Sequence, residues 1–225
     1  MNKLLLTLST FAVAFVTFAS PLAAQAEDIK GDVKAGQTKN AMCIGCHGIA
    51  GYQASFPEVY KVPKISGQGA KYIVSALNAY KKGDRKHPSM RGIAEALSDQ
   101  DMADLAAYYS VHGVVDGATL AAKPSKEPSP QVAALLSKAA CISCHGENFA
   151  KPIIPDYPKI AGQHSDYLFV ALKAYKTENN PLIGRSNGVM GGIVKQFSIA
   201  ELKELSKYIS SVDGDLKTVP QAKFR

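Results

Sequence analysis

The chain has 225 residues, a hydrophobic content of 46% and a formal net charge of +7. This length suits one large domain or two small ones, and the apolar content is sufficient for a packed core. The lysines are scattered along the chain and form no long basic run. This argues against a nucleic-acid-binding tail and favours an ordinary solvated surface.

Residues 1–26 have the character of a targeting segment. Lys3 supplies a positive start, the run from Leu4 to Phe18 is apolar apart from Thr and Ser, and Ala24-Gln25-Ala26 is a small-x-small cleavage site. This pattern is typical of a secretory signal peptide, and the run is shorter than the ~20 residues that span a bilayer. We expect export to the periplasm, with no transmembrane segment after cleavage; an uncleaved membrane anchor is the alternative.

The first half of the remaining chain is predicted to be helical. Asp32 is a suitable N-cap for a helix that runs into Cys43. Apolar side chains repeat at helical spacing over residues 70–82, and Gly83 is placed to end that helix. No convincing run of alternating strand residues occurs, so an all-α fold is expected.

The second half of the chain repeats the first in the same order, which indicates a duplicated domain. The recurring elements are Cys43-Ile44-Gly45-Cys46-His47-Gly48 with Cys141-Ile142-Ser143-Cys144-His145-Gly146, Pro63-Lys64-Ile65-Ser66-Gly67-Gln68 with Pro158-Lys159-Ile160-Ala161-Gly162-Gln163, Arg85 and Met90 with Arg185 and Met190, and the capping boxes Ser98/Asp101 with Ser198/Glu201. We predict two small helical domains, 27–115 and 131–225. The linker 116–130 is rich in proline and is expected to be extended.

All four cysteines belong to the two Cys-x-x-Cys-His sites, a pattern typical of c-type haem attachment. Two thiols at this spacing can each form a thioether with one vinyl group of a haem, and the following histidine is then placed beneath the iron. We therefore predict two covalently bound haem c groups, attached at Cys43, Cys46, Cys141 and Cys144, with His47 and His145 as iron ligands.

Other interpretations of the Cys-x-x-Cys-His sites fit the sequence less well. A thioredoxin-like pair would need a βαβ context. A zinc site would need four ligands, and each half supplies one too few. Structural disulfides suit a secreted protein but leave the duplicated histidine unexplained.

Met90 and Met190 are matched candidates for the second axial ligand, since each completes an Arg-x-x-x-x-Met pattern. A thioether opposite histidine raises the reduction potential, although a methionine by itself is as easily core filler. Met42 is expected on the proximal side, and Met102 lies within a predicted helix. The remaining histidines, His87, His112 and His164, have no counterpart in the other half and are expected in loops or at the surface, with His87 the alternative ligand because it is near Met90.

Two further groups of residues are candidates for contacts to the haems. A backbone carbonyl of the turns that begin at Pro63 and Pro158 is expected to accept the N–H of the proximal histidine, which fixes the ring; a simple turn is the alternative. Side chains able to hydrogen-bond haem propionates are Arg85, Arg185, Tyr80 and Tyr175.

The chain resembles the diheme cytochrome c4 family over essentially all of the predicted mature region. The resemblance is carried by the tandem Cys-x-x-Cys-His-Gly sites, the Pro-Lys-Ile-x-Gly-Gln turns, the Arg-x-x-x-x-Met pairs and the Ser-Asp-Gln-Asp helix start. It implies two class I cytochrome c domains related by a pseudo-two-fold axis, with the haems facing each other. His47 and Met90 would ligate one iron, and His145 and Met190 the other. The loop between Thr177 and Val189 is longer than its counterpart, which leaves its shape open.

The expected function is electron transfer without catalysis of a substrate reaction. The resemblance implies periplasmic donors to a terminal oxidase or other respiratory acceptor, so the partners are redox proteins, with no nucleic acid and no small-molecule substrate. The alternatives are a haem subunit of a larger oxidoreductase, such as a flavocytochrome sulfide dehydrogenase, and a diheme peroxidase with one open iron. A secreted disulfide-bonded helical protein without haem is the simplest rival.

Overall fold

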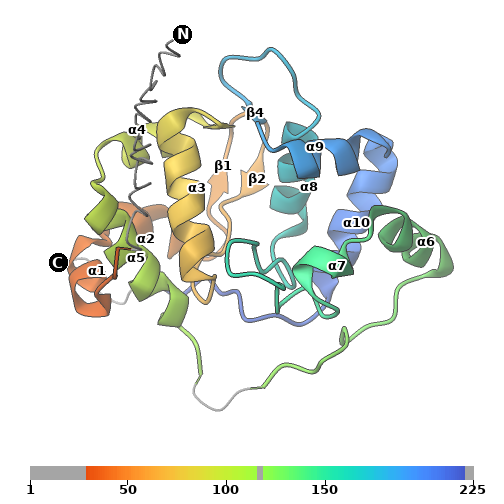
Figure 1. Cartoon of the computed structure of the whole chain (residues 1–225), viewed down its shortest axis with the longest axis horizontal. Coiled ribbons are helices and arrows are strands. Elements are labelled where there is room, and N and C mark those ends of the chain that lie inside the picture. The colour runs from red at the N-terminus through yellow and green to blue at the C-terminus, as the bar shows by residue number, and fades with distance from the viewer. Residues whose placement is uncertain (1–28, 116–118, 221–225) are drawn as a thin grey trace, which may run out of the picture.

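The computed structural model describes residues 29–115 and 119–220, so the predicted signal peptide lies outside the described residues. Two helical domains lie side by side, and residues 119–129 run along one edge of the molecule before the second domain begins (Figure 1). The first domain contains α1 (Val33–Lys39), α2 (Ala41–His47), α3 (Ala70–Lys82), α4 (Pro88–Glu95) and α5 (Asp99–Val111). The second contains α6 (Pro130–Ala139), α7 (Ile142–His145), α8 (Ser165–Ala174), α9 (Gly188–Lys195) and α10 (Ile199–Ser211). None of the helices within these described ranges is long and apolar enough to cross a membrane.

Short strands supplement the helices. In the first domain β1 (Gln53–Ala54) pairs antiparallel with β2 (Tyr60–Lys61). Between the domains β3 (Arg85–Lys86) pairs antiparallel with β4 (Gly184–Arg185), in a register that places Arg85 opposite Arg185. A helical fold was predicted, and this second ladder is the addition that matters, because it joins equivalent segments of the two repeats.

Local signals in the sequence account for most helix ends. Both capping boxes form, at Ser98 before α5 and at Ser198 before α10. Gly83 ends α3 in the left-handed conformation with φ 85°. The predicted helix from Asp32 to Cys43 is wrong in one respect, because the chain breaks at the buried residue Asn40 into α1 and α2. The break lets α1 pack along α5 while α2 carries its cysteines to the centre of the molecule.

Asp104 fastens α1 to α5. Its side chain is 2% exposed and accepts hydrogen bonds from the Asp32 N–H at 2.8 Å, Lys39 Nζ at 2.6 Å and Gln100 Nε2 at 2.8 Å. The Lys39 ammonium and the Asp32 N–H hold the pKa of Asp104 below its usual value, although burial acts in the opposite direction. The bonds satisfy a buried charge that would otherwise be costly.

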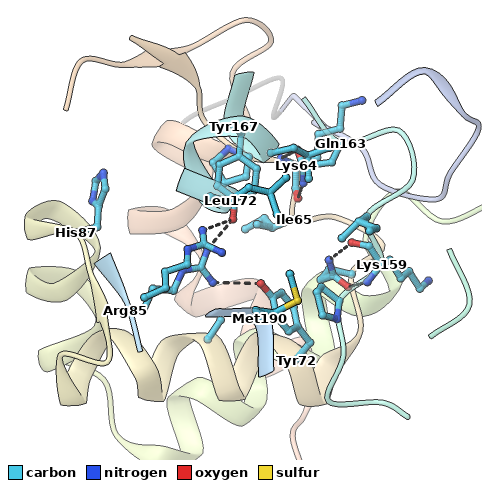
Figure 2. Close-up of a pocket in the computed structure, with 18 of the residues that line it drawn as sticks. Lys64, Ile65, Tyr72, Arg85, His87, Lys159, Gln163, Tyr167, Leu172 and Met190 are labelled. Carbon is cyan, nitrogen blue, oxygen red and sulfur yellow. Dashed lines mark hydrogen bonds between the residues drawn. The ribbon is translucent and has the colours of Figure 1, made fainter. Parts of the chain in front are cut away.

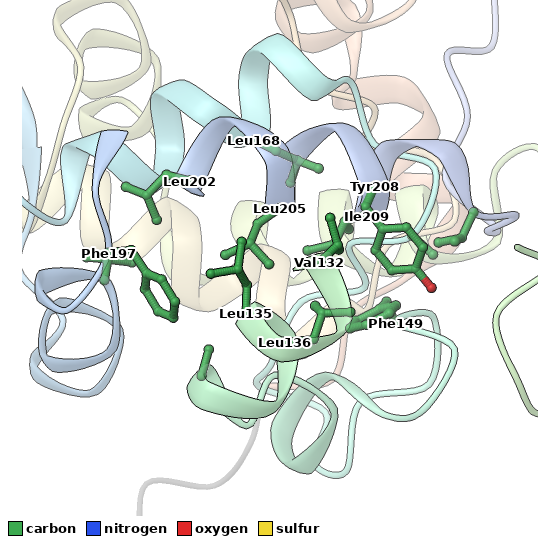
Figure 3. Packing of buried hydrophobic residues seen from close by; sticks show 14 of the residues in the cluster. Val132, Leu135, Leu136, Phe149, Leu168, Phe197, Leu202, Leu205, Tyr208 and Ile209 are labelled. Atoms are coloured by element: carbon green, nitrogen blue, oxygen red, sulfur yellow. The ribbon is translucent and has the colours of Figure 1, made fainter. Parts of the chain in front are cut away.

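The second domain has the larger apolar core. Leu135 and Leu136 of α6 face Leu202, Leu205 and Ile209 of α10, and this packing closes the domain on its outer side (Figure 3). In the first domain α3 and α5 supply the equivalent core through Ile73, Leu105, Ala106 and Tyr109. Met102 lies in α5, as predicted, and is fully buried.

Both connecting segments are held against a domain. The linker is bound to the second domain, because Tyr208 Oη donates to the Lys126 carbonyl at 2.9 Å and Asn148 Nδ2 donates to the Ala121 carbonyl at 2.7 Å. After α10 the chain returns to the first domain, where the Lys217 N–H donates to the Ser66 carbonyl at 3.0 Å. The two domains are therefore tied together by the C-terminal segment as well as by the linker.

Candidate functional site

A cavity of about 940 Å³ opens between the two domains. It is lined by all of the residues that the sequence singles out for haem binding, namely Cys43, Cys46, His47, Met90, Cys141, Cys144, His145 and Met190. None of the four cysteines is used in a disulfide, so each sulfur is available for a thioether bond. The cavity is apolar over most of its wall, as a flat hydrophobic cofactor requires.

The two histidines are held in the same way. His47 ends α2, and its Nδ1 lies 2.7 Å from the Pro63 carbonyl; His145 ends α7, and its Nδ1 lies 2.9 Å from the Pro158 carbonyl. A carbonyl can only accept, so Nδ1 carries the proton in both rings. Burial lowers the pKa of both histidines, which favours the neutral ring with a free lone pair on Nε2. The prediction for the two proline turns is confirmed.

Met90 and Met190 occupy equivalent places, each in the first turn of its helix, α4 or α9. The backbone N–H of Met90 donates to His87 Nδ1 at 3.3 Å, and that of Met190 donates to Asn187 Oδ1 at 2.9 Å. Both methionines are half-buried in the cavity wall. The extra length of the second loop is absorbed before Arg185, so α9 keeps the register of α4.

The remaining histidines all lie outside helices and strands, as expected, and each is half-buried. His87 caps α4 through Nδ1, and its Nε2 lies 3.0 Å from Tyr60 Oη, so both ring nitrogens are engaged. His112 stacks on Tyr108 and hydrogen-bonds Ser66, whereas His164 precedes α8. Met42 borders the cavity but is 69% exposed.

Two arginines and four tyrosines form a polar cluster in the cavity wall, and Figure 2 shows Arg85 of this cluster beside Tyr72 and Tyr167. Arg85 Nη2 donates to Tyr167 Oη at 2.6 Å and Arg185 Nη2 donates to the same oxygen at 3.1 Å. Arg85 Nη1 also donates to Tyr72 Oη at 3.2 Å. The guanidinium groups lie over the rings of Tyr80 and Tyr175, at 4.6 Å and 5.3 Å from their centroids.

This cluster carries positive charge that the described residues do not neutralise. None of the ion pairs among them involves Arg85 or Arg185. Burial raises the pKa of the Tyr167 hydroxyl, but the two arginines outweigh this and bring it to about 8. The buried Nε of Arg85 has no hydrogen-bond partner. An apolar cavity with unneutralised guanidinium groups fits a haem, whose propionates are anionic.

The sequence had indicated both arginines and the tyrosines beneath them, but not Tyr72 and Tyr167. These two recur at equivalent places at the starts of α3 and α8, so the repeat itself held the signal. Gln68 and Gln163 were seen only as parts of a turn. In the structure both are buried at the domain boundary and bind the opposite domain.

The fold and the duplicated site define a diheme c-type cytochrome, with a haem c bound covalently by each domain. The cytochrome c family matches twice, over residues 33–110 and 131–213. Cytochrome c4 of Stutzerimonas stutzeri is 32% identical over 193 residues, which cover 81% of this chain and 90% of that protein. The chain belongs to the cytochrome c4 family, and is a two-domain electron-transfer cytochrome.

Two further similarities extend this result. The crystal structure of reduced recombinant cytochrome c4 from Pseudomonas stutzeri is 28% identical and gives a TM-score of 0.58, covering 81% of this chain and 100% of that one. A thiosulfate dehydrogenase electron acceptor of Stutzerimonas stutzeri strain A1501 is 28% identical over 178 residues, covering 76% of this chain and 78% of that protein.

Proposed function

We propose that this protein is a free one-electron carrier of the periplasm, which takes electrons from respiratory donors and passes them to a terminal oxidase or another acceptor. The observation that carries the proposal is one shared cavity, into which both domains bring a Cys-x-x-Cys-His site and a methionine. No group suited to act as a nucleophile or general base is required of the chain, because no substrate bond is made or broken.

The ligand assignment follows from the duplication. We assign His47 and Met90 to one iron and His145 and Met190 to the other, with thioethers to Cys43, Cys46, Cys141 and Cys144. When bound, the haems would supply reversible exchange of one electron at each iron. The proline carbonyls orient the two histidine rings and raise their basicity. The methionine thioethers are neutral and favour a high potential.

Export and organisation complete the proposal. Residues 1–26 act as a cleaved signal peptide, since covalent haem attachment of this type takes place outside the cytoplasm. Residues 27–115 and 131–225 form the two domains, and residues 116–130 link them. The family matches over 33–110 and 131–213 support this division.

A spectroelectrochemical titration of the purified holoprotein, with and without carbon monoxide, tests the proposal. Two one-electron steps at high potential, both unaffected by the gas, are expected if histidine and methionine close both irons. A low-potential or gas-binding haem in the wild type would overturn the ligand assignment and favour an open iron, as in a diheme peroxidase.

A second candidate function is electron acceptance from one dedicated dehydrogenase. The similarity to a protein named thiosulfate dehydrogenase electron acceptor favours it. This second candidate is related to the alternative in which the protein is a haem subunit of a larger oxidoreductase, such as a flavocytochrome. Two measurements with a thiosulfate dehydrogenase distinguish these two functions: rapid mixing of the oxidised protein with the enzyme and its substrate, and gel filtration of the two proteins together. Fast reduction and co-elution support a dedicated partner. Slow reduction and separate elution support the free carrier.

A further inference from the structure

The two domains exchange a reciprocal set of hydrogen bonds through their equivalent glutamines. Gln163 Oε1 accepts from the Lys64 N–H at 3.0 Å, and its Nε2 donates to the Lys64 carbonyl at 2.9 Å. Gln68 Oε1 accepts from the Lys159 N–H at 2.9 Å, and its Nε2 donates to the Lys159 carbonyl at 2.9 Å. Figure 2 shows the first pair, with Gln163 beside Lys64.

Each glutamine reaches the peptide group that holds the other domain's histidine. The Pro63 carbonyl and the Lys64 N–H belong to one planar peptide unit. His47 binds that unit at its oxygen, and Gln163 binds it at its nitrogen. In the second domain His145 and Gln68 bind the two ends of the peptide unit between Pro158 and Lys159 in the same way.

The glutamines are themselves firmly placed. Both are 4% exposed, and each Oε1 also accepts the N–H of the next residue, Gly69 or His164, at 2.9 Å and 3.0 Å. The preceding glycines have φ of 83° and 68°, and their N–H groups donate to the carbonyls of Tyr109 and Ile209 near the ends of α5 and α10. The glutamine side chains are thus fixed by their own domain and directed into the other.

We infer that Gln163 is a positioning residue for His47 and Gln68 is a positioning residue for His145, so that each proximal histidine is held from the opposite domain. A hydrogen bond to the peptide N–H polarises the peptide unit and strengthens its carbonyl as an acceptor. A stronger bond at Nδ1 makes the imidazole a more basic ligand, which stabilises the ferric state and lowers the potential. Loss of a glutamine therefore raises the potential of the haem in the other domain. The inference rests on the axial roles proposed for the two histidines.

The test is a matched pair of variants, Gln163→Met and Gln68→Met, each of which is the control for the other. Methionine keeps the length of the side chain but neither accepts from nor donates to the peptide as the amide does. Potentials are measured by NMR-monitored redox titration of the holoprotein. The haems are told apart in the reduced state by contacts to the ring of Tyr109 in the first domain and of Phe197 in the second, both of which line the cavity.

Gln163→Met is expected to raise only the potential of the first haem and to speed solvent exchange of the His47 Nδ1 proton, by less than the roughly tenfold expected for complete loss of a hydrogen bond, because the bond to Pro63 is weakened and not removed. Gln68→Met is expected to do the same only to the second haem and His145. Gln163→Glu, which keeps an oxygen acceptor for the Lys64 N–H, is expected not to raise the first potential.

Three results would overturn the inference: a change of potential only in the haem of the domain that carries the substitution, equal changes in both haems, or no change. A purely structural role at the domain boundary does not predict a change of potential confined to the haem of the opposite domain. If Gln163→Met does not assemble with two haems, Gln163→Asn carries the same test, since its side chain is too short to reach the peptide. Haem ring-current shifts on the ring protons of His47 and His145 in the wild type test the premise. Their absence would contradict the proposed ligands, whereas their presence without the crossed pattern would contradict this inference alone.

Discussion

Arg85 and Arg185 lie directly opposite each other in the ladder between the domains, and both guanidinium groups donate to the hydroxyl of Tyr167. Two like charges so close together repel each other, and a shared acceptor at low dielectric offsets part of that cost. The arrangement holds two cations at the centre of the cavity wall, where each domain contributes one.

Replacing Tyr167 by Phe is expected to destabilise the protein by about 1.5–3 kcal/mol, the usual range for hydrogen bonds to charged groups. Tyr72→Phe is the matched control, because Tyr72 binds Arg85 alone and through a longer bond of 3.2 Å. Chemical denaturation of the holoprotein measures both. A loss for Tyr72→Phe as large as that for Tyr167→Phe would show that sharing the acceptor has no special importance.

Met90→Ala and Met190→Ala are each expected to lower the potential of one haem sharply and to allow that haem to bind carbon monoxide, because the iron loses its thioether ligand. Visible spectra with and without the gas, together with a redox titration, provide the measurement. Met42→Ala is the control, since Met42 is 69% exposed. If neither cavity methionine gives this response, the axial assignment is wrong.

Asp104→Asn is expected to destabilise the first domain by about 1–3 kcal/mol at neutral pH, because the amide cannot accept all the bonds that the buried carboxylate receives from Asp32, Lys39 and Gln100. Glu204 occupies the equivalent place in the second domain, where its side chain is 44% exposed and, among the described residues, pairs with Lys207 alone. Glu204→Gln should therefore change the free energy of unfolding by less than about 0.5 kcal/mol. Comparable losses for both variants would contradict this account.

The stability of the wild type should also fall in acid through Asp104. Its pKa is lowered on folding, so its contribution is present above the unfolded value of about 4 and is lost as the pH falls through the folded value. Between neutral pH and pH 4 little change is expected from this group. Below about pH 4, the free energy of unfolding measured by urea denaturation should fall more steeply with decreasing pH for the wild type than for Asp104→Asn. Equal slopes would contradict a contribution of Asp104 to the acid sensitivity.

Gly36→Ala is expected to destabilise the contact between α1 and α5 by about 1–3 kcal/mol, because a Cβ at this position would lie 2.0 Å from the Asp104 carbonyl oxygen. Gly92→Ala, in α4, is the contrasting variant. Its Cβ would meet nothing within 4 Å, so the loss of freedom in the unfolded chain should stabilise the protein by about 0.4–1 kcal/mol. Thermal unfolding followed by circular dichroism distinguishes these opposite signs.

Much of this protein was determined by the sequence alone, because the relevant signals are local. The spacing of Cys43, Cys46 and His47, its repetition in the second half, and the capping boxes at Ser98 and Ser198 each depend on residues a few positions apart. Backbone geometry converts such spacing directly into a turn, a helix start or a cofactor attachment site. The duplication then pointed to Met90 and Met190, which no single pattern would have distinguished from core residues.

The docking of the domains was decided only by the tertiary structure. The sequence indicates Gln68 and Gln163 only as turn residues and Asn40 only as part of a continuous helix, and it does not single out Tyr167. Their partners lie in the other domain or on another helix, at sequence separations that no local spacing encodes. A buried polar side chain must find a hydrogen-bond partner, but which partner it finds depends on how the two repeats pack together.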